Sequence, residues 1–178
     1  MKENEQLKIY SKTLSSKHTV FLNEVSDPIY FNDFFNLLQN CGEKDFVEIN
    51  INSFGGLECS AIQFYNELKN CKAHIHCSTS GYCCSAGSVV LLAGNTWTIT
   101  KNSKIMIHSP SGWFSGKHND VITRIDFERE WVNSFFKEVY KGFLTEKEIK
   151  EAIEGKDFWF TGEEAITRLE KMVKEKKQ

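Results

Sequence analysis

An α/β fold with a largely parallel sheet is predicted by three neighbouring patterns in the sequence. Residues 46–52 alternate apolar and polar side chains, as a half-buried strand does. Residues 57–70 place apolar side chains at helical spacing, and residues 73–77 form a second short strand-like segment. A strand, a helix and a strand in succession make a β-α-β unit, and repeated units of this kind predict a single α/β domain.

The next elements are predicted in chain order from turn and helix signals. The Ser-Thr-Ser-Gly sequence of residues 78–81 predicts a loop, and residues 86–93 predict a buried helix that ends before Gly94. Short strands are predicted near residues 97–100 and at residues 104–108, the second of which ends in His108. Residues 111–116 contain glycine and predict a loop or a hairpin arm.

A long helix is predicted from Asp120, its expected N-cap, to about Lys141. Phe127 and Trp131 lie off the main apolar stripe of this helix, so we expect it to contact another subunit as well as its own core. Two further helices are predicted, at residues 145–154 and from Thr161 onward. The stripe that should face the core consists of Val121, Ile125, Val132, Phe135, Phe136 and Val139.

Length and composition restrict the class of protein. The chain has 178 residues, which predicts one domain over residues 1–178, and its net charge of −2 provides no field to attract nucleic acid or anionic lipid. The longest apolar run, residues 88–94, is too short to span a bilayer, and the acidic residues 1–6 do not resemble a signal peptide. We therefore expect a cytoplasmic protein whose six cysteines are reduced, buried thiols, and a solvated lysine-rich end from residue 171.

Four positions have side chains or backbone suited to acyl-transfer chemistry. Ser85 precedes the residue 86–93 helix, whose free N–H groups would stabilise a negative charge near its hydroxyl. Gly55-Gly56 follows a strand and allows close backbone approach, although no phosphate-binding glycine motif is present. His108 ends a strand, and Asp157 follows the helix-stopping Gly155. Each of these residues alone is more often a cap, turn or structural residue.

Taken in order, these segments resemble the proteolytic subunit of the Clp protease, the ClpP family. Residues 52–56, Asn-Ser-Phe-Gly-Gly, resemble the family's Asn-Ser-Pro-Gly-Gly, and residues 81–87, Gly-Tyr-Cys-Cys-Ser-Ala-Gly, resemble Gly-x-Ala-Ala-Ser-Met-Gly. Residues 106–110, Met-Ile-His-Ser-Pro, are similar to Met-Ile-His-Gln-Pro, and residues 156–165 resemble Arg-Asp-x-Phe-x-Ser-Ala-Glu-Glu-Ala. The chain departs from the family at Phe54, which replaces a proline, and at Cys83-Cys84, which replace two alanines.

The resemblance implies a fold, a site and an assembly. It implies a ClpP/crotonase-like α/β fold of repeated β-β-α and β-α-β units with a protruding handle at about residues 111–141. It assigns Ser85 as nucleophile, His108 as general base and acid and Asp157 as the orienting carboxylate, with an oxyanion hole from the N–H groups of Gly56 and Ala86. No cofactor or metal is implied. The implied partners are further copies of the chain in a ring such as a double heptamer, peptide or unfolded-protein substrates, and an AAA+ Clp ATPase unfoldase.

Several alternatives stay open. The chain could be an inactive ClpP-like ring scaffold, although no triad residue has been lost, or an acyl-CoA-processing enzyme of crotonase-like architecture, which would not need a Ser-His-Asp set. Cys83 or Cys84 could serve as nucleophile. The His74-x-His76 pair next to Cys77 could bind a metal if a third ligand were present. Glu154 competes with Asp157 for the third catalytic position, and a Ser-His dyad without a carboxylate is a further possibility.

Overall fold

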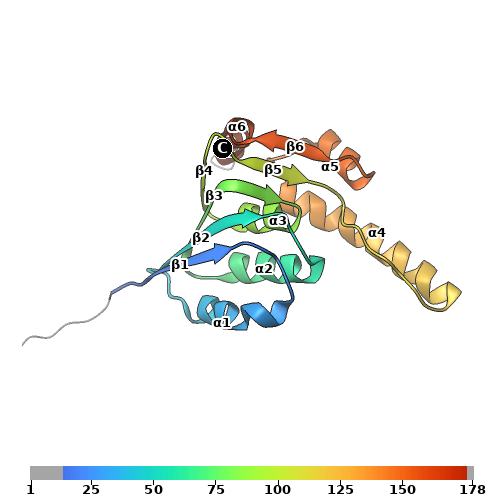
Figure 1. The fold of residues 1–178 in the computed structure, drawn as a ribbon, viewed down its shortest axis with the longest axis horizontal. Coiled ribbons are helices and arrows are strands. Elements are labelled where there is room, and N and C mark those ends of the chain that lie inside the picture. Colours follow the sequence, from blue (N-terminus) through green and yellow to red (C-terminus); the bar gives the residue numbers. More distant parts are fainter. Residues whose placement is uncertain (1–13, 176–178) are drawn as a thin grey trace, which may run out of the picture.

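The computed structural model describes residues 14–175 and has a central sheet with helices packed against it (Figure 1). The strands run in the order β1-β2-β3-β5-β6, and β4 also pairs with β3. Every pair is parallel except β5 with β6, so the predicted α/β fold with a largely parallel sheet is confirmed. The strands are β1 (Lys17–Leu22), β2 (Phe46–Ser53), β3 (His74–Cys84), β4 (Thr96–Ile99), β5 (Lys104–Ile107) and β6 (Phe158–Thr161). The helices are α1 (Asn32–Asn40), α2 (Glu58–Asn70), α3 (Ala86–Ala93), α4 (His118–Tyr140), α5 (Glu146–Ile153) and α6 (Gly162–Glu175), with a 3-10 turn, η1 (Pro28–Phe31).

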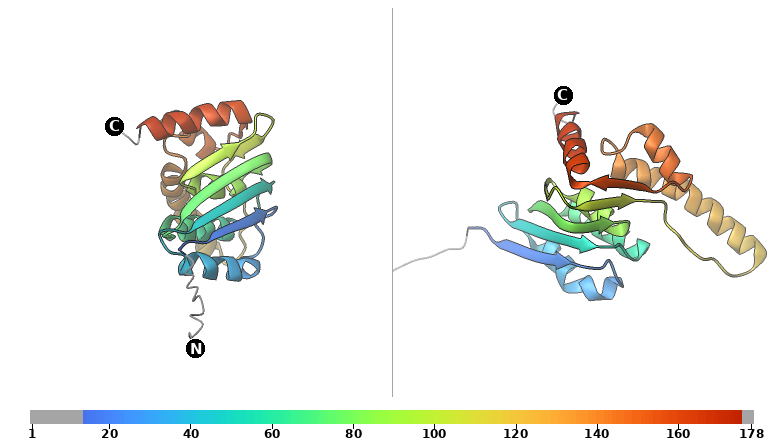
Figure 2. Two further views of the ribbon diagram at one scale, coloured as in Figure 1. Left: turned by 90° about the vertical axis from the view of Figure 1, so that its left-hand side faces the viewer. Right: turned by 45° about the horizontal axis from the view of Figure 1, so that its top comes forward.

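Helices cover one face of the sheet, and the other face is open (Figure 2). In β2 the side chains of Val47, Ile49 and Ile51 are buried beneath the helices, as the alternation of residues 46–52 predicts. α3 is buried along its whole length and packs against β2, β3 and α2 at the centre of the core. On the open face, Phe21 of β1 is 75% exposed.

The predicted loop at residues 78–81 is wrong, because β3 continues through it to Cys84. The first half of β3 pairs with β4 and its last three residues pair with β5, so both halves of the long strand have a hydrogen-bonded neighbour. Ser78 donates a hydrogen bond to Asn50 of β2 at 2.7 Å. The polar side chains that suggested a loop therefore belong to a strand, because tertiary pairing outweighs local propensity.

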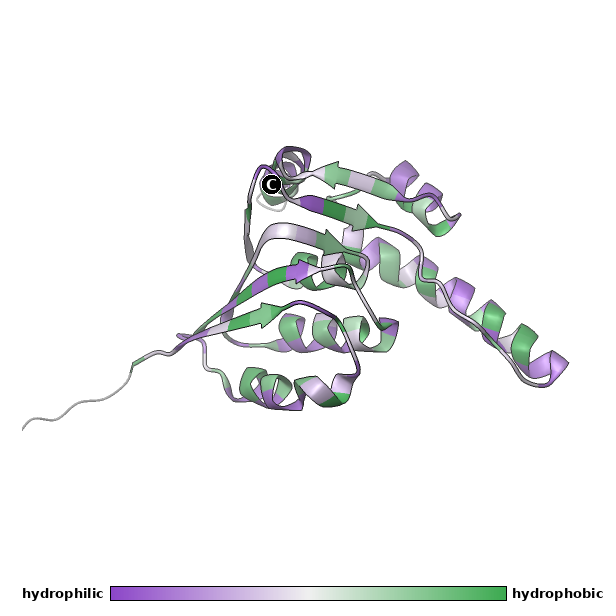
Figure 3. Cartoon of the chain, in the orientation of Figure 1, coloured by the Kyte–Doolittle hydropathy of each residue, from purple (hydrophilic) through white to green (hydrophobic). Residues whose placement is uncertain are grey.

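The long helix α4 differs from prediction in its start and in its buried face. It begins at His118, its N-cap residue Lys117 makes no side-chain capping bond, and Asp120 lies in the first turn. Only Phe136, Val139 and Tyr140 are buried in α4, and Ile125 is exposed. The first part of the helix projects from the domain together with the preceding segment (Figure 1), so the apolar stripe there has no core to face. Apolar and polar residues alternate along this projection (Figure 3).

The C-terminal helices begin as predicted and are joined by an ion pair. Thr145 and Glu148 form a reciprocal capping box at the start of α5. Thr161 and Glu164 make the same exchange of hydrogen bonds at the start of α6. Arg168 of α6 then donates two hydrogen bonds to Glu148, at 2.7 and 2.9 Å, which fix α6 against α5.

Three elements of the fold were not predicted, and some positions discussed from the sequence lie outside the residues that the structure describes. β1, α1 and β6 were absent from the predicted order of elements, and residues 1–6 and 176–178 lie outside the described residues. Within residues 14–175 no helix is both long and apolar enough to cross a membrane. All six cysteines are free thiols, but the expectation that all are buried is wrong, because Cys59 is exposed and Cys71 is half-buried.

Candidate active site

The candidate residues gather at one edge of the sheet because of its topology. β2, β3 and β5 run parallel, so the chain leaves all three strands at the same edge. Gly55-Gly56 follows β2, Ser85 follows β3 and His108 follows β5. Gly56, Ser85, Ala86 and His108 all line one pocket at this edge.

Ser85 occupies a sharp turn between β3 and α3. Its φ of 53° and ψ of −124° make it the one residue other than glycine with a positive φ in the described chain. This conformation costs free energy, and the surrounding hydrogen bonds hold it in place. The Ser85 N–H donates to Met106 of β5 at 2.8 Å, and the Ser85 carbonyl accepts from the N–H and the Oγ of Ser88 at 2.8 and 2.7 Å. The turn presents the Ser85 hydroxyl to the pocket.

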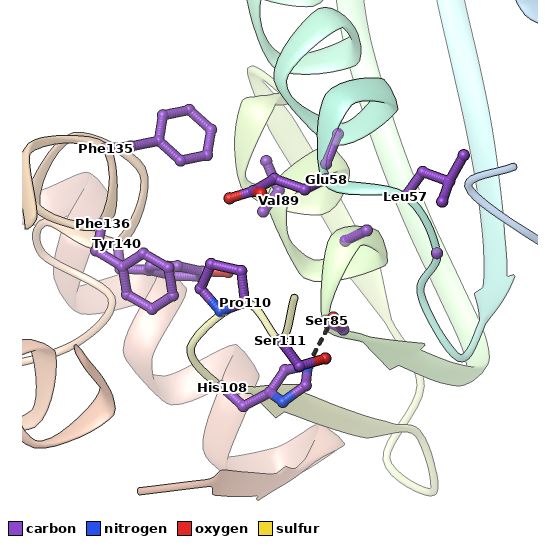
Figure 4. A pocket seen from close by; sticks show the side chains of 13 residues that line it. Leu57, Glu58, Ser85, Val89, His108, Pro110, Ser111, Phe135, Phe136 and Tyr140 are labelled. Carbon is purple, nitrogen blue, oxygen red and sulfur yellow. Dashed lines mark hydrogen bonds between the residues drawn. The ribbon is translucent and has the colours of Figure 1, made fainter. Parts of the chain in front are cut away.

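His108 lies within hydrogen-bonding distance of this hydroxyl. Its Nε2 is 2.8 Å from Ser85 Oγ (Figure 4). Both side chains are half-buried, so solvent and a substrate can reach them from the pocket. This distance suits transfer of the serine proton to the imidazole when the hydroxyl attacks a carbonyl.

The Gly55-Gly56 turn passes so close to Ser85 that side chains are excluded from it. Gly55 has a φ of 116°, and a Cβ there would lie 2.7 Å from Ser85 Cβ; a Cβ at Gly56, where φ is 148°, would overlap the Val25 carbonyl. The buried Ser53 supports the turn by accepting from the Gly55 N–H at 3.1 Å. Within residues 14–175 the N–H groups of Gly56 and Ala86 donate to no acceptor, so both are free beside the pocket.

Asp157, which precedes β6, and His108, which follows β5, both adjoin the end of the β5–β6 ladder, but no hydrogen bond joins them. The antiparallel register pairs Ile107 with Phe158, and His108 and Asp157 are the next residues of the two chains beyond this last pair. Asp157 is exposed and forms no hydrogen bond or ion pair in the described part of the chain. Glu154, its competitor, lies 3.9 Å from Lys150 in an exposed ion pair.

The chain matches a known protein family. The family model of Clp protease matches residues 1–168. The chain belongs to the Clp protease family. It is 30% identical over 132 residues to the ATP-dependent Clp protease proteolytic subunit 1 of Salinibacter ruber (strain DSM 13855 / M31), an alignment covering 72% of this chain. The same alignment covers 56% of that relative, so the chain spans little more than half of the relative's length.

Cys83 and Cys84, which replace two alanines of the family motif, are buried thiols. Burial raises the pKa of the Cys83 thiol well above its ordinary value and raises that of Cys84 as well. A thiol attacks as the thiolate, so neither cysteine is suited to act as nucleophile. Phe54, which replaces the family's proline, is 74% exposed, and its ring centre lies 4.6 Å from that of Tyr82.

The two histidines that suggested a metal site are both within hydrogen-bonding distance of a threonine. His74 Nε2 and His76 Nδ1 lie 2.8 and 2.9 Å from the same hydroxyl, that of Thr96. Phe46 stacks against both rings. In residues 14–175 no group of three histidine, cysteine or acidic side chains is placed to hold a metal ion.

The sequence did not predict three residues that lie near the site: Ser88, Tyr140 and Glu58. Tyr140, at the end of α4, is fully buried, and its hydroxyl lies 2.9 Å from Ser88 Oγ. A chain of hydrogen bonds thus connects α4 through Ser88 to the Ser85 carbonyl. Glu58, at the start of α2, lines the pocket. The signal for Ser88 was its position one helical turn after Ser85, whereas nothing in the sequence marked Tyr140 or Glu58.

Proposed function

We propose that this chain is a serine endopeptidase subunit that cleaves peptides or unfolded protein chains. The observation that carries the proposal is the 2.8 Å contact between His108 Nε2 and the hydroxyl of Ser85, which a strained turn presents to a pocket. Membership of the Clp protease family supports the same activity.

The proposed reaction begins when Ser85 Oγ attacks the scissile carbonyl carbon while His108 takes the serine proton. The negative charge that develops on the carbonyl oxygen is stabilised by the N–H groups of Gly56 and Ala86, which have no other acceptor among the described residues. His108 then gives the proton to the leaving amine, and the acyl group remains on Ser85. A water molecule, deprotonated by His108, hydrolyses this ester and restores the serine.

Asp157 is the proposed third member of the triad. Its carboxylate would accept the Nδ1–H of His108, which keeps Nε2 directed at Ser85 and stabilises the protonated ring. The strand register supports this role, since His108 and Asp157 are the residues next to the last paired residues of β5 and β6, Ile107 and Phe158.

The proposal includes an assembled ring in the cytoplasm built from copies of a single domain over residues 1–178. The projecting part of α4 supports it, because Ile122, Ile125 and Phe127 are exposed apolar residues on a helix that leaves its own domain. A Clp ATPase that unfolds and delivers protein substrates is the proposed partner. Light scattering of the purified chain should give the mass of an oligomer, and a monomer at micromolar concentration would contradict the ring.

Replacement of Ser85 by alanine tests the activity. Hydrolysis of fluorogenic peptides by the Ser85→Ala variant should fall by about 10⁴- to 10⁶-fold, because loss of a nucleophile leaves only binding and oxyanion stabilisation. Labelling by a serine-directed phosphonate should vanish as well. Ser80→Ala is the matched control. Ser80 is exposed on β3, the strand that precedes Ser85, so this variant should leave both readouts unchanged. Unaltered hydrolysis in Ser85→Ala, or a wild-type protein that neither cleaves peptides nor takes the label, would refute the proposal.

A further inference from the structure

The pocket beside Ser85 and His108 has mostly apolar walls. It has a volume of about 160 Å³ and lies between α2, α3 and the end of α4 (Figure 4). Leu57, Ala61, Val89 and Phe136 are among the residues that line it. Walls of this kind favour an aliphatic side chain, because each buried CH₂ group stabilises the bound state.

One carboxylate interrupts this apolar lining. The Glu58 side chain extends from the start of α2 into the space between Val89 and Phe135 (Figure 4). In residues 14–175 it has no hydrogen bond and no ion pair. Burial, together with the nearby charge of Glu128, raises the pKa of Glu58. Glu58 as a residue stays exposed to solvent, and its carboxylate has no cation to pair with in the described part of the chain.

Two arginines of α4 form ion pairs along their own helix, although one of them, Arg129, lines a neighbouring pocket together with Glu58. Arg124 pairs with Glu128 at 3.9 Å, and Arg129 pairs with Asp126 at 3.6 Å, both along α4. The guanidinium of Arg124 also lies over the Phe114 ring, at 4.7 Å from its centre. A ligand that brought a positive charge into the pocket would supply the partner that Glu58 lacks.

We propose that this pocket selects substrates with lysine or arginine on the acyl side of the scissile bond. The inference rests on the proposed peptidase function and names the substrate class for the same site. The aliphatic stem of such a residue would lie against Leu57, Val89 and Phe136, and its charged end would pair with the carboxylate of Glu58. A leucine would fill the apolar part but would leave the carboxylate unpaired, and a glutamate would be repelled.

The test compares peptides that differ in one side chain. Three fluorogenic tripeptides of identical sequence carry lysine, norleucine or glutamate next to the reporter, so norleucine supplies the aliphatic stem without the charge. For the wild-type protein, kcat/KM should be at least 10-fold higher with lysine than with norleucine, and lowest with glutamate. Glu58→Gln should lower kcat/KM for the lysine peptide by about 10- to 100-fold, the size expected for loss of a charged hydrogen bond, and should leave norleucine within about threefold.

Controls separate this inference from the proposed activity. Glu128→Gln removes the neighbouring charge but not the proposed ligand, so the preference for lysine should persist. Equal or faster cleavage of norleucine by wild type, or an equal effect of Glu58→Gln on both peptides, overturns the inference while leaving the peptidase standing. If instead Glu58 pairs with a cation of a second copy of the chain, Glu58→Gln alters the mass in light scattering without changing peptide preference, which also overturns it. No cleavage of any peptide together with no phosphonate label on Ser85 refutes the proposed function itself.

Discussion

Replacing Glu148 with glutamine would remove the charge that joins α5 to α6. In the folded chain the two carboxylate oxygens of Glu148 accept from Arg168, and the Arg168 guanidinium lies 4.5 Å from the centre of the Phe160 ring. These hydrogen bonds from Arg168 lower the pKa of Glu148 from its ordinary 4.5 to about 2. α5 comes directly before β6 in the chain and α6 directly after it, so the ion pair anchors the helices that flank this strand. Asp157 is the residue just before β6.

The size and pH dependence of the effect follow from that pKa. At 1.36 kcal/mol per pKa unit, the difference corresponds to about 3 kcal/mol of stability at neutral pH. Solvent reaches 20% of the Glu148 side chain and 28% of Arg168, so screening reduces the expected loss to about 2 kcal/mol. The folded-state pKa lies below the unfolded-state pKa, so this stabilisation is complete above about pH 5 and is lost as the pH falls from 4.5 through 2.

Urea unfolding followed by tryptophan fluorescence measures this difference. At a fixed protein concentration, Glu148→Gln should lower the free energy of unfolding by about 2 kcal/mol at pH 7, and its curve should converge with wild type near pH 2. Glu146→Gln is the control, because Glu146 is exposed on the same helix and forms no ion pair in the described chain. A Glu148→Gln loss no larger than that of the control, or one that persists unchanged at pH 2, would show that the charge of Glu148 does not stabilise the fold.

Two further predictions concern the site. Asp157→Asn should lower kcat for a fluorogenic peptide by about 10⁴, because an asparagine favours the wrong tautomer of His108, whereas Glu154→Gln should change kcat by less than about twofold. The reverse ranking would transfer the role to Glu154, and near-normal rates in both would indicate a dyad. Tyr140→Phe, which removes the hydroxyl bonded to Ser88, should lower the free energy of unfolding by about 1 kcal/mol and reduce kcat several-fold at constant KM. If peptide assays show an unchanged kcat, the Tyr140 hydroxyl contributes to packing alone.

The elements with a clear apolar period were the ones that could be predicted from sequence. β2, α2 and α3 lie within one or two residues of their predicted ranges, because each buries one face or all of its surface against the core. The extension of β3 through residues 78–81 could not be predicted, since its pairing with β4 and β5 involves distant residues. The start of α4 was misplaced because Asp120 has the chemistry of an N-cap, yet the helix begins without one.

The candidate site was predictable where backbone geometry leaves a mark on the sequence. Gly55 and Gly56 are glycines because a Cβ at either position would clash, at Gly55 with Ser85 itself. Tyr140 and Glu58 leave no such mark, because a buried tyrosine and a helix-start glutamate have ordinary structural uses. Their proximity to the serine depends on how α4 and α2 pack, which is a tertiary property.

β6 is the last strand of the sheet to be synthesised. The strands that bring Gly56, Ser85 and His108 to their shared edge are all synthesised before α4, whereas β6 follows α4 and α5 and runs in the opposite direction. A ribosome-bound chain that has not yet reached β6 contains the serine and the histidine but lacks the carboxylate that the proposed mechanism pairs with His108. The order of synthesis therefore separates the proposed carboxylate from the proposed nucleophile and base until the last strand has been made and has docked.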